Sequence, residues 1–269
     1  MEDCPAGPPF RCLLLGGVLF WNWYERVLKL KVESNFNVQG GEVMEFRLHE
    51  EGDVYLIDVD VREVIIAGMT GRDQKMVQKH LDELAELGIA PPSSIPVYYR
   101  VSASLLTQES RIQVVGPDSS GEVEAVLIGT SEGMLVAVGS DHTDRKLEAN
   151  SIASSKQMCP KPISLDTWRY ADVASAWDDL QLVSDKVIGG VWSPYQRGTM
   201  SQVRKPEDLV GRFFKGMTEL PAGVVMFTGT IPAIGEISGA DHFSMALVDP
   251  KNGRTLWHGY DAAILPNVV

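Results

Sequence analysis

Two glutamates, Glu122 and Glu124, have a spacing that suits metal chemistry. They flank Val123 in the alternating run Glu122–Ile128, which predicts a β-strand. Residues two apart in a strand point to the same face, so both carboxylates project together and repel each other. A hard divalent cation such as Mg²⁺ prefers oxygen ligands and would neutralise the pair. The alternative is two solvated glutamates on an outer face, which is the commoner outcome for this pair taken alone.

A charged loop follows the next predicted strand, Met134–Val138. The segment Ser140–Arg145 contains two aspartates, a histidine, a threonine and an arginine, a composition that suits a site. The alternative is a polar surface turn in which Asp144 caps the helix that follows. Lys156 adds a cation that could pair with a substrate carboxylate or enolate, although the protein surface is the commoner place for a single lysine.

Four pieces of sequence, in one order, resemble the motifs of the fumarylacetoacetate hydrolase (FAH) superfamily. In that family they read as an ExE strand, a DxTxRD loop, a downstream lysine and a GDxxxTGTPxGxG strand and turn. Here they are Glu122-Val-Glu124, Asp141-x-Thr143-x-Arg145, Lys156 and the segment Gly223–Gly235. The resemblance covers roughly residues 64–248. It implies a β-rich α+β fold, with an FAH-like mixed β-sandwich or β-roll core and peripheral helices.

The resemblance also implies a divalent-metal site. Glu122, Glu124 and Asp141 match the positions of the family's metal ligands, and Asp73 stands where the hydrolase that names the family has an additional ligand. The implied ion is Mg²⁺, with Mn²⁺ or Ca²⁺ as alternatives.

Catalytic and substrate-binding residues are implied in the same way. His80 and Glu83 match an HxxE that several family members carry in a mobile segment over the site, where it works as an acid/base pair. Three residues apart on a helix, they share a face, so Glu83 could orient the imidazole. The alternative is a surface histidine beside acidic neighbours. Lys156 completes the expected catalytic set. The expected substrate-binding set is Arg145, Glu148, Gly229 and Thr230.

The chain departs from the family pattern at several positions. Lys146, Arg100 and Val224 differ from the usual residues without removing a metal ligand. Glu148 stands where the hydrolase that names the family has a glutamine that contacts the substrate. The resemblance therefore does not fix which substrate this chain prefers.

The resemblance implies a reaction that passes through an enolate. The family's ion chelates a 2-oxo acid or 1,3-dicarbonyl unit and stabilises its enolate. We expect a metal-dependent hydrolase or lyase that acts on a small 2-oxo acid or β-dicarbonyl compound, by C–C cleavage or decarboxylation. A dehydratase or enol-keto isomerase is the alternative on the same scaffold, and a catalytically silent binding protein is the alternative of another class. Family members are commonly homodimers, and we expect one here.

The elements that must position these residues are mostly strands. Alternation and β-branched runs predict a hairpin from 44–48 and 54–59, and a helix is predicted from Asp73 to Leu87. Other strands are predicted at 64–67, 97–101, 111–115, 223–228, 243–248 and 255–258. A helix is expected within 140–162 and another at 206–214, and the zone 168–190 fits either a helix or a strand. Residues 1–43 differ in pattern, so we predict an N-terminal extension outside a single catalytic domain of residues 44–269.

Composition narrows the classes of partner. The chain has 269 residues with a formal net charge of -12 and 44% hydrophobic residues, which fits a globular protein. The acidic balance argues against binding to nucleic acid phosphates or anionic lipid. Three cysteines without metal-ligand spacing indicate neither a disulfide framework nor a zinc site. The apolar stretch 13–20 is too short to span a membrane, and we expect a cytoplasmic protein.

Overall fold

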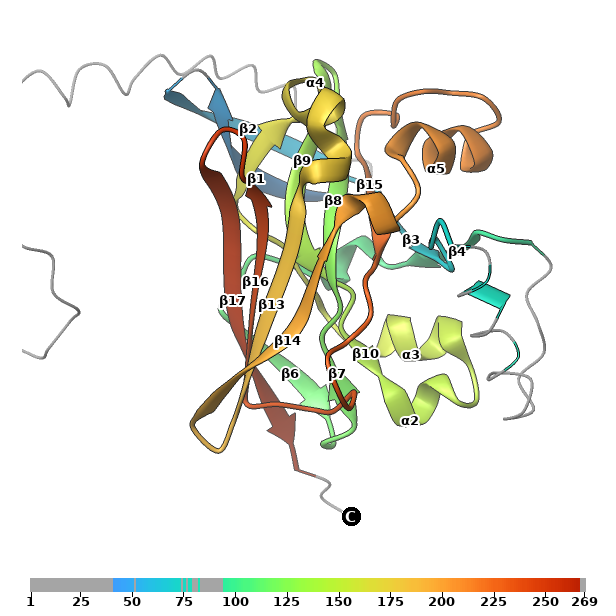
Figure 1. Ribbon diagram of the computed structural model, residues 1–269, viewed down its shortest axis with the longest axis vertical. Coiled ribbons are helices and arrows are strands. Elements are labelled where there is room, and N and C mark those ends of the chain that lie inside the picture. The colour runs from blue at the N-terminus through green and yellow to red at the C-terminus, as the bar shows by residue number, and fades with distance from the viewer. Residues whose placement is uncertain are drawn as a thin grey trace, which may run out of the picture. The chain divides into compact units, whose positions relative to one another are not determined.

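The computed structural model describes residues 41–50, 52–73, 75, 77–78, 82 and 94–266. A sheet of eight strands organises these residues, in the order β2-β1-β12-β9-β8-β15-β3-β4 (Figure 1). Its strands are β1 (Glu42–Glu50), β2 (Asp53–Val61), β3 (Glu63–Gly68), β4 (Val97–Val101), β8 (Val123–Thr130), β9 (Gly133–Ser140), β12 (Asp166–Arg169) and β15 (Val224–Thr230).

A second sheet of five strands has the order β14-β13-β16-β17-β6. Its strands are β6 (Arg111–Val115), β13 (Gln181–Ile188), β14 (Val191–Thr199), β16 (His242–Asp249) and β17 (Arg254–Leu265). Two short ribbons complete the strands, β5 (Leu106–Thr107) beside β11 (Lys161–Pro162) and β7 (Ser119–Ser120) beside β10 (Thr143–Asp144).

The strands β8 and β9 bury both of their faces. Alternate residues such as Ala125 and Leu127 join one apolar cluster, which also contains Phe243 and Leu247 of the five-stranded sheet. The residues between them, such as Val126, join a second apolar cluster on the other face. Burial of both faces explains why β8 and β9 read as nearly continuous apolar runs. A charge on either strand is therefore expensive unless it lies at a strand end and is paired.

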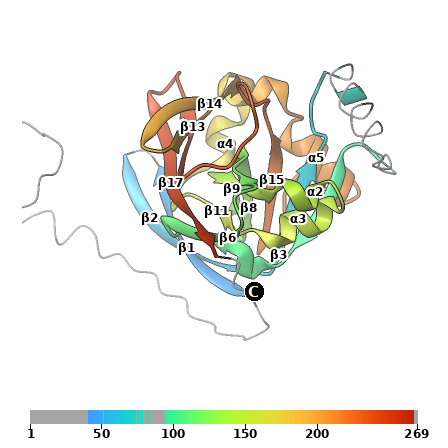
Figure 2. The same ribbon diagram turned by 90° about the horizontal axis from the view of Figure 1, so that it is seen from below.

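Short helices lie at the periphery. They are α2 (Arg145–Glu148), α3 (Ile152–Met158), α4 (Tyr170–Val173), α5 (Pro206–Phe213) and the 3₁₀ turns Ala103–Leu105, Ala174–Asp179 and Met200–Gln202. Both ribbon views place β8 and β9 between the five-stranded sheet on one side and α2 and α3 on the other (Figures 1 and 2). No helix in the described part of the chain is long and apolar enough to cross a membrane.

The predicted fold class is confirmed, because the described chain is rich in strands, with a large sheet and few, peripheral helices. The predicted hairpin is confirmed as β1 and β2, which pair antiparallel. The zone 168–190 contains β12, α4, a 3₁₀ turn and β13, and residues 140–162 contain two helices where one was expected. The strand β17 is longer than predicted because its second half pairs with β6. Most of the predicted helix 73–87, and residues 1–40 of the predicted extension, lie outside the described residues.

Candidate metal centre

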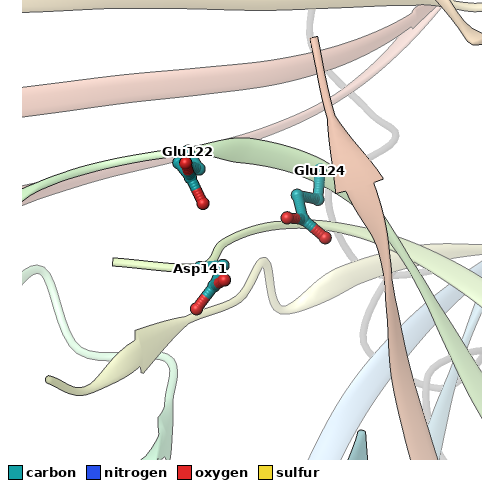
Figure 3. A group of neighbouring side chains, drawn as sticks. All are labelled: Glu122, Glu124 and Asp141. Carbon is teal, nitrogen blue, oxygen red and sulfur yellow. The ribbon is translucent and has the colours of Figure 1, made fainter. Parts of the chain in front are cut away.

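Three carboxylates meet at the adjoining ends of β8 and β9. The strands pair antiparallel with Glu124 opposite Gly139, and the amide of Asp141 donates to the carbonyl of Glu122 at 3.0 Å. Because alternate residues share a face, Glu122, Glu124 and Asp141 all project toward the second apolar cluster. Each offers an oxygen within 4.8 Å of the others' (Figure 3).

Two glycines lie beside this group, one at a tightly packed position and one with a left-handed backbone. At Gly139, an added Cβ would lie 2.7 Å from a methyl carbon of Val126 and 2.9 Å from the ring of Phe227. Gly229 has a φ of +101°, where the pairing of β15 with β8 changes register between Phe227 and Thr230. This irregularity aims the Gly229 amide at Glu124 Oε2, to which it donates at 2.7 Å.

Glu124 is the most strongly perturbed of the three acids. Its side chain is buried, and burial together with the negative charges of Asp141 and Glu122 raises the pKa of Glu124 well above its usual value. The Gly229 amide opposes this shift by donating to the carboxylate. A bound cation would favour the ionised form of all three acids, so occupation of the site and ionisation of Glu124 support each other.

Lys156 neutralises part of the charge. It lies on α3, whose first turn is capped by the Ser151 side chain, and Nζ donates to Asp141 Oδ2. The same Nζ is 3.9 Å from Glu122 Oε2. Burial alone would lower the pKa of Lys156, but the two carboxylates outweigh it and raise that pKa. Lys156 therefore lies against the acidic group, and its role toward a substrate stays a prediction.

Arg145 forms ion pairs with two glutamates, one of which belongs to the acidic group. Its Nη2 is 2.9 Å from Glu122 Oε1, its Nη1 donates to Glu148 Oε2 at 3.0 Å, and its Nε donates to Ser120 Oγ at 2.7 Å. The helix cap that was the alternative interpretation of this loop is also present. Asp144 caps α2 by accepting from the Leu147 amide at 2.9 Å. The loop thus both starts a helix and places Arg145 against the acidic group.

Lys161 lies beside the acidic group, although it was not among the residues predicted from the sequence. Its side chain is fully buried, and Nζ lies 3.3 Å from Asp141 Oδ1. Nζ also donates to the carbonyl oxygens of His142 at 2.6 Å and Cys159 at 3.0 Å. Burial lowers the pKa of Lys161, although Asp141 opposes the shift. For Asp141, burial acts against ionisation, but Lys156 and Lys161 together lower its pKa.

A neutral hydrogen-bonded network lies on the opposite face of the same strand ends. The ring of His142 is hydrogen-bonded to the Tyr260 hydroxyl at 3.0 Å and to Ser119 Oγ at 2.9 Å. Ser140 Oγ contacts Tyr260 at 2.9 Å and accepts from the Glu122 amide at 3.1 Å. Burial, and then the nearby cations Lys161 and Arg145, lower the pKa of His142 to about 3. A histidine within a charged loop was the available signal for this network, but its partner comes from β17.

The other predicted residues occupy varied places. Asp73 is exposed and accepts from the Lys75 amide at 2.9 Å, and it is not a member of the acidic group. Gly229 contacts Glu124 through its amide, and the Thr230 hydroxyl donates to the Val123 carbonyl at 2.8 Å. His80 and Glu83 lie outside the described residues. Their acid/base role, the substrate contacts of Gly229 and Thr230, and ligation by Asp73 stay predictions.

The donor set fits a hard divalent cation. All three side chains offer carboxylate oxygens, and the buried Asp141 Oδ1 is paired by charge with Lys161 Nζ at 3.3 Å. Oxygen donors of this kind suit Mg²⁺, Mn²⁺ or Ca²⁺ rather than a soft metal. Among the described residues, this is the one group of three or more acidic, histidine or cysteine side chains spaced to hold a metal.

Comparison with known proteins gives the same fold. A family described as a protein of unknown function, DUF2848, matches residues 67–260. No curated protein matches the sequence. A proposed fumarylacetoacetate isomerase/hydrolase from Oleispira antarctica is similar in structure, with a TM-score of 0.58, 17% identity, and coverage of 81% of this chain and 99% of that one.

Two further solved structures agree. Yeast ynq8, a fumarylacetoacetate hydrolase family protein, has a TM-score of 0.54 and 16% identity, with 77% of this chain and 95% of that chain covered. A proposed fumarylpyruvate hydrolase from Burkholderia cenocepacia has a TM-score of 0.53 and 18% identity, with 87% and 100% covered. The fold that the sequence resemblance implied is thereby confirmed.

Proposed function

The chain belongs to the DUF2848 family and has the fold of fumarylacetoacetate hydrolase family proteins, and from this premise we propose that it is a divalent-metal-dependent hydrolase or lyase acting on a small 2-oxo acid or β-dicarbonyl compound. The observation that carries the proposal is the convergence of Glu122, Glu124 and Asp141 beside Lys156. Fold alone hosts many activities, so the site, and not the fold, supports the chemistry.

Glu122, Glu124 and Asp141 would hold the ion, for which Mg²⁺ is the first choice. When bound, the ion supplies a Lewis acid that stabilises the enolate of a chelated oxo acid or dicarbonyl unit. The Gly229 amide keeps one oxygen of Glu124 in place, so the second oxygen remains for the ion. Arg145 holds Glu122 in the same way from the side of α2.

Lys156 is the cation that we propose for contact with the substrate. Its Nζ lies against both Asp141 and Glu122, where a carboxylate or enolate oxygen of a bound substrate would come near it. A developing negative charge in a buried setting is stabilised most by a fixed positive charge close by. We propose that Lys156 supplies this charge, while His80, oriented by Glu83, moves the proton or activates water.

For Arg145 we propose an indirect role, which differs from the substrate contact that the resemblance implied. Glu122 and Glu148 both pair with its guanidinium, so its charge is already balanced within the protein. We propose that Glu148 acts on the substrate through Arg145, by limiting how much positive charge the site presents. This arrangement favours a substrate with few anionic groups and differs from a site with glutamine at this position.

An activity screen tests the proposal. Acylpyruvates, oxaloacetate and 2-keto-3-deoxy acids would be offered to the full chain with Mg²⁺ or Mn²⁺ and, as the control, after treatment with a chelator. We expect turnover of at least one acylpyruvate or 2-oxo acid that the chelator abolishes. Turnover of the deoxy acids alone would favour the dehydratase. A chain that binds the ion but turns over no compound would favour the silent binding protein.

The homodimer expected from the resemblance stays a prediction. Sedimentation velocity on the full chain would test it directly. A monomer at concentrations where the activity is measured would contradict it.

A further inference from the structure

Gln196 connects the five-stranded sheet to the strand that begins between two of the three acids. It lies on β14, and its side chain is buried. Its Oε1 accepts from the Val123 amide at 2.9 Å, and its Nε2 donates to Thr230 Oγ1 at 2.8 Å and to the Ile231 carbonyl at 2.6 Å. One side chain therefore joins β14, the start of β8 and the end of β15.

The partners of Gln196 fix the orientation of its amide group. The Val123 amide only donates and the Ile231 carbonyl only accepts, so the side-chain oxygen must face Val123 and the nitrogen must face Ile231. An ionised glutamate here would lack the donor, and a methionine would lack the donor and offer only a weak acceptor. The contacts therefore use both ends of the glutamine amide.

The Thr230 side chain completes the contacts around Val123. Its hydroxyl donates to the Val123 carbonyl at 2.8 Å and accepts from Gln196. Both main-chain groups of Val123 are thus bonded to side chains, beside the place where the pairing of β8 with β15 changes register. Buried backbone groups need hydrogen-bond partners, and these two side chains supply them where the strand pairing is irregular.

Val123 is the residue between the two glutamates of the acidic group. Its amide nitrogen belongs to the peptide that joins it to Glu122, and its carbonyl belongs to the peptide that joins it to Glu124. The ligand atoms of a metal site must lie within about 0.2 Å of their ideal distances from the ion. A rotation of either peptide is magnified along a glutamate side chain, so the directions of both carboxylates depend on the contacts of Val123.

The strand β14 also holds the turn that follows β15. Outside its side-chain contacts, Gln196 forms a β-bridge with Ala233 in this turn. Gly229, whose amide donates to Glu124, lies just before the same turn. Contacts from β14 therefore reach Glu124 by two routes, one through Val123 and one through Gly229.

We infer that Gln196 is a positioning residue of the metal centre, which holds the Glu122-Val-Glu124 strand in the geometry that binds the ion. The inference rests on the proposed metal site. It assigns to Gln196 no contact with the ion or with a substrate, because the side-chain amide is used by Val123, Thr230 and Ile231. Its effect on metal binding passes through the main chain of the two glutamates.

Gln196→Met tests the inference by isothermal titration of Mn²⁺ into the full chain. The substitution keeps the length of the side chain and removes its donor. Outer groups that orient metal ligands typically contribute about 10- to 100-fold to affinity, so we expect Gln196→Met to bind Mn²⁺ more weakly by about that factor. Thr230→Val, which removes only a hydroxyl, should also weaken binding. Because both side chains act on Val123, the double variant should lose less affinity than the product of the two single losses.

Thr130→Val is the matched control. Thr130 lies at the opposite end of β8, where its hydroxyl donates to the Gly133 carbonyl at 2.7 Å and accepts from the Glu132 amide at 3.1 Å. The substitution removes the same kind of contact between a side chain and the main chain. Its Mn²⁺ affinity should stay within about threefold of that of the unsubstituted chain, because distant sites contribute independently.

Thermal unfolding identifies the temperature below which each variant is folded, and the titrations are made there. A folded Gln196→Met with the Mn²⁺ affinity of the unsubstituted chain would overturn the inference, as would equal losses of affinity in Gln196→Met and Thr130→Val. If Gln196→Met does not fold, Thr230→Val decides in its place, and unchanged Mn²⁺ affinity in that variant would overturn the inference. Absence of Mn²⁺ binding to the unsubstituted chain would instead overturn the proposed metal site, and this inference with it.

Discussion

The two faces at the adjoining ends of β8 and β9 differ in charge, although their residues are neighbours in the sequence. On one face lie the carboxyl groups of Glu122, Glu124 and Asp141, of which Glu122 pairs with arginine and Asp141 with lysine. On the other, Ser140 and His142 join Tyr260 in a network without formal charge. Asp141 and His142 are adjacent in sequence but lie on opposite faces because side chains alternate along extended chain.

The difference shows how a buried acidic group can be held without being neutralised completely. The neutral network binds the backbone, since Ser140 accepts from the Glu122 amide and Tyr260 ties the loop to β17. The carboxylates are thereby positioned through their main chain. Their oxygens then remain available to the side chains of Arg145 and Lys156.

The largest effect is expected from breaking the charged face. Glu122→Gln with Glu124→Gln removes two of three anionic ligands, and neutral amides are poor substitutes for a hard divalent ion. We expect calorimetric titration to show no Mg²⁺ binding by the double variant, with activity lost. Glu42→Gln with Glu45→Gln is the control, because both of these glutamates are exposed on β1. Equal Mg²⁺ binding by the two double variants would contradict the assignment.

Loss of the proposed general base should leave the charged face intact. A positioned acid/base group contributes about 10²- to 10⁴-fold, so His80→Ala should lower kcat by about that factor with metal affinity nearly unchanged. Gln78→Ala, in the same segment, is the control. Loss of metal binding in His80→Ala would make His80 a ligand. Turnover within about threefold of the unsubstituted chain would move the role elsewhere, with Glu148 as the next candidate.

Acid should destabilise the folded chain by protonating His142 in the neutral network. Its pKa is about 3 in the folded chain, below the 6.5 of the unfolded chain, so the unfolded state takes up the proton first. The stability that neutral His142 confers is complete above pH 6.5 and is lost as the pH falls toward 3. Each pH unit in this window costs up to about 1.4 kcal/mol.

Urea unfolding between pH 7 and pH 4 measures this loss. We expect the free energy of unfolding to fall more steeply for the unsubstituted chain than for His142→Gln, which cannot take up the proton. His49→Gln, at a half-exposed histidine of β1, is the control and should keep the steep dependence. Parallel pH profiles for the His142→Gln and unsubstituted chains would show that another group is responsible.

The smallest effect is expected from Tyr260→Phe. The change removes the hydroxyl that contacts His142 and Ser140 and leaves the ring packed against Phe243. We expect the free energy of unfolding to fall by about 1–2 kcal/mol, the usual result of losing hydrogen bonds to buried groups. Chemical denaturation measures it. If the free energy of Mg²⁺ binding falls by more than the free energy of unfolding, the neutral network positions the carboxylates directly rather than supporting the loop alone.

The sequence by itself determined the features that depend on local alternation and on motif order. Glu122 and Glu124 share a face because a strand has a period of two, and the run that contains them could only be a buried strand or an exposed one. The FAH-like motifs then selected the fold, and the structure confirms it. The sequence also predicted the capping of α2 by Asp144, as one of two interpretations of the same loop.

Only the tertiary structure decided which groups meet the carboxylates. Gly229 donates to Glu124 across 105 residues, and Tyr260 contacts His142 across 118. Lys161 could not be chosen from the sequence, because a lysine between two prolines carries no periodic signal and its burial depends on where the chain runs after α3. Local sequence specifies the face to which a side chain points, but the partner on that face is set by the path of distant segments through the fold.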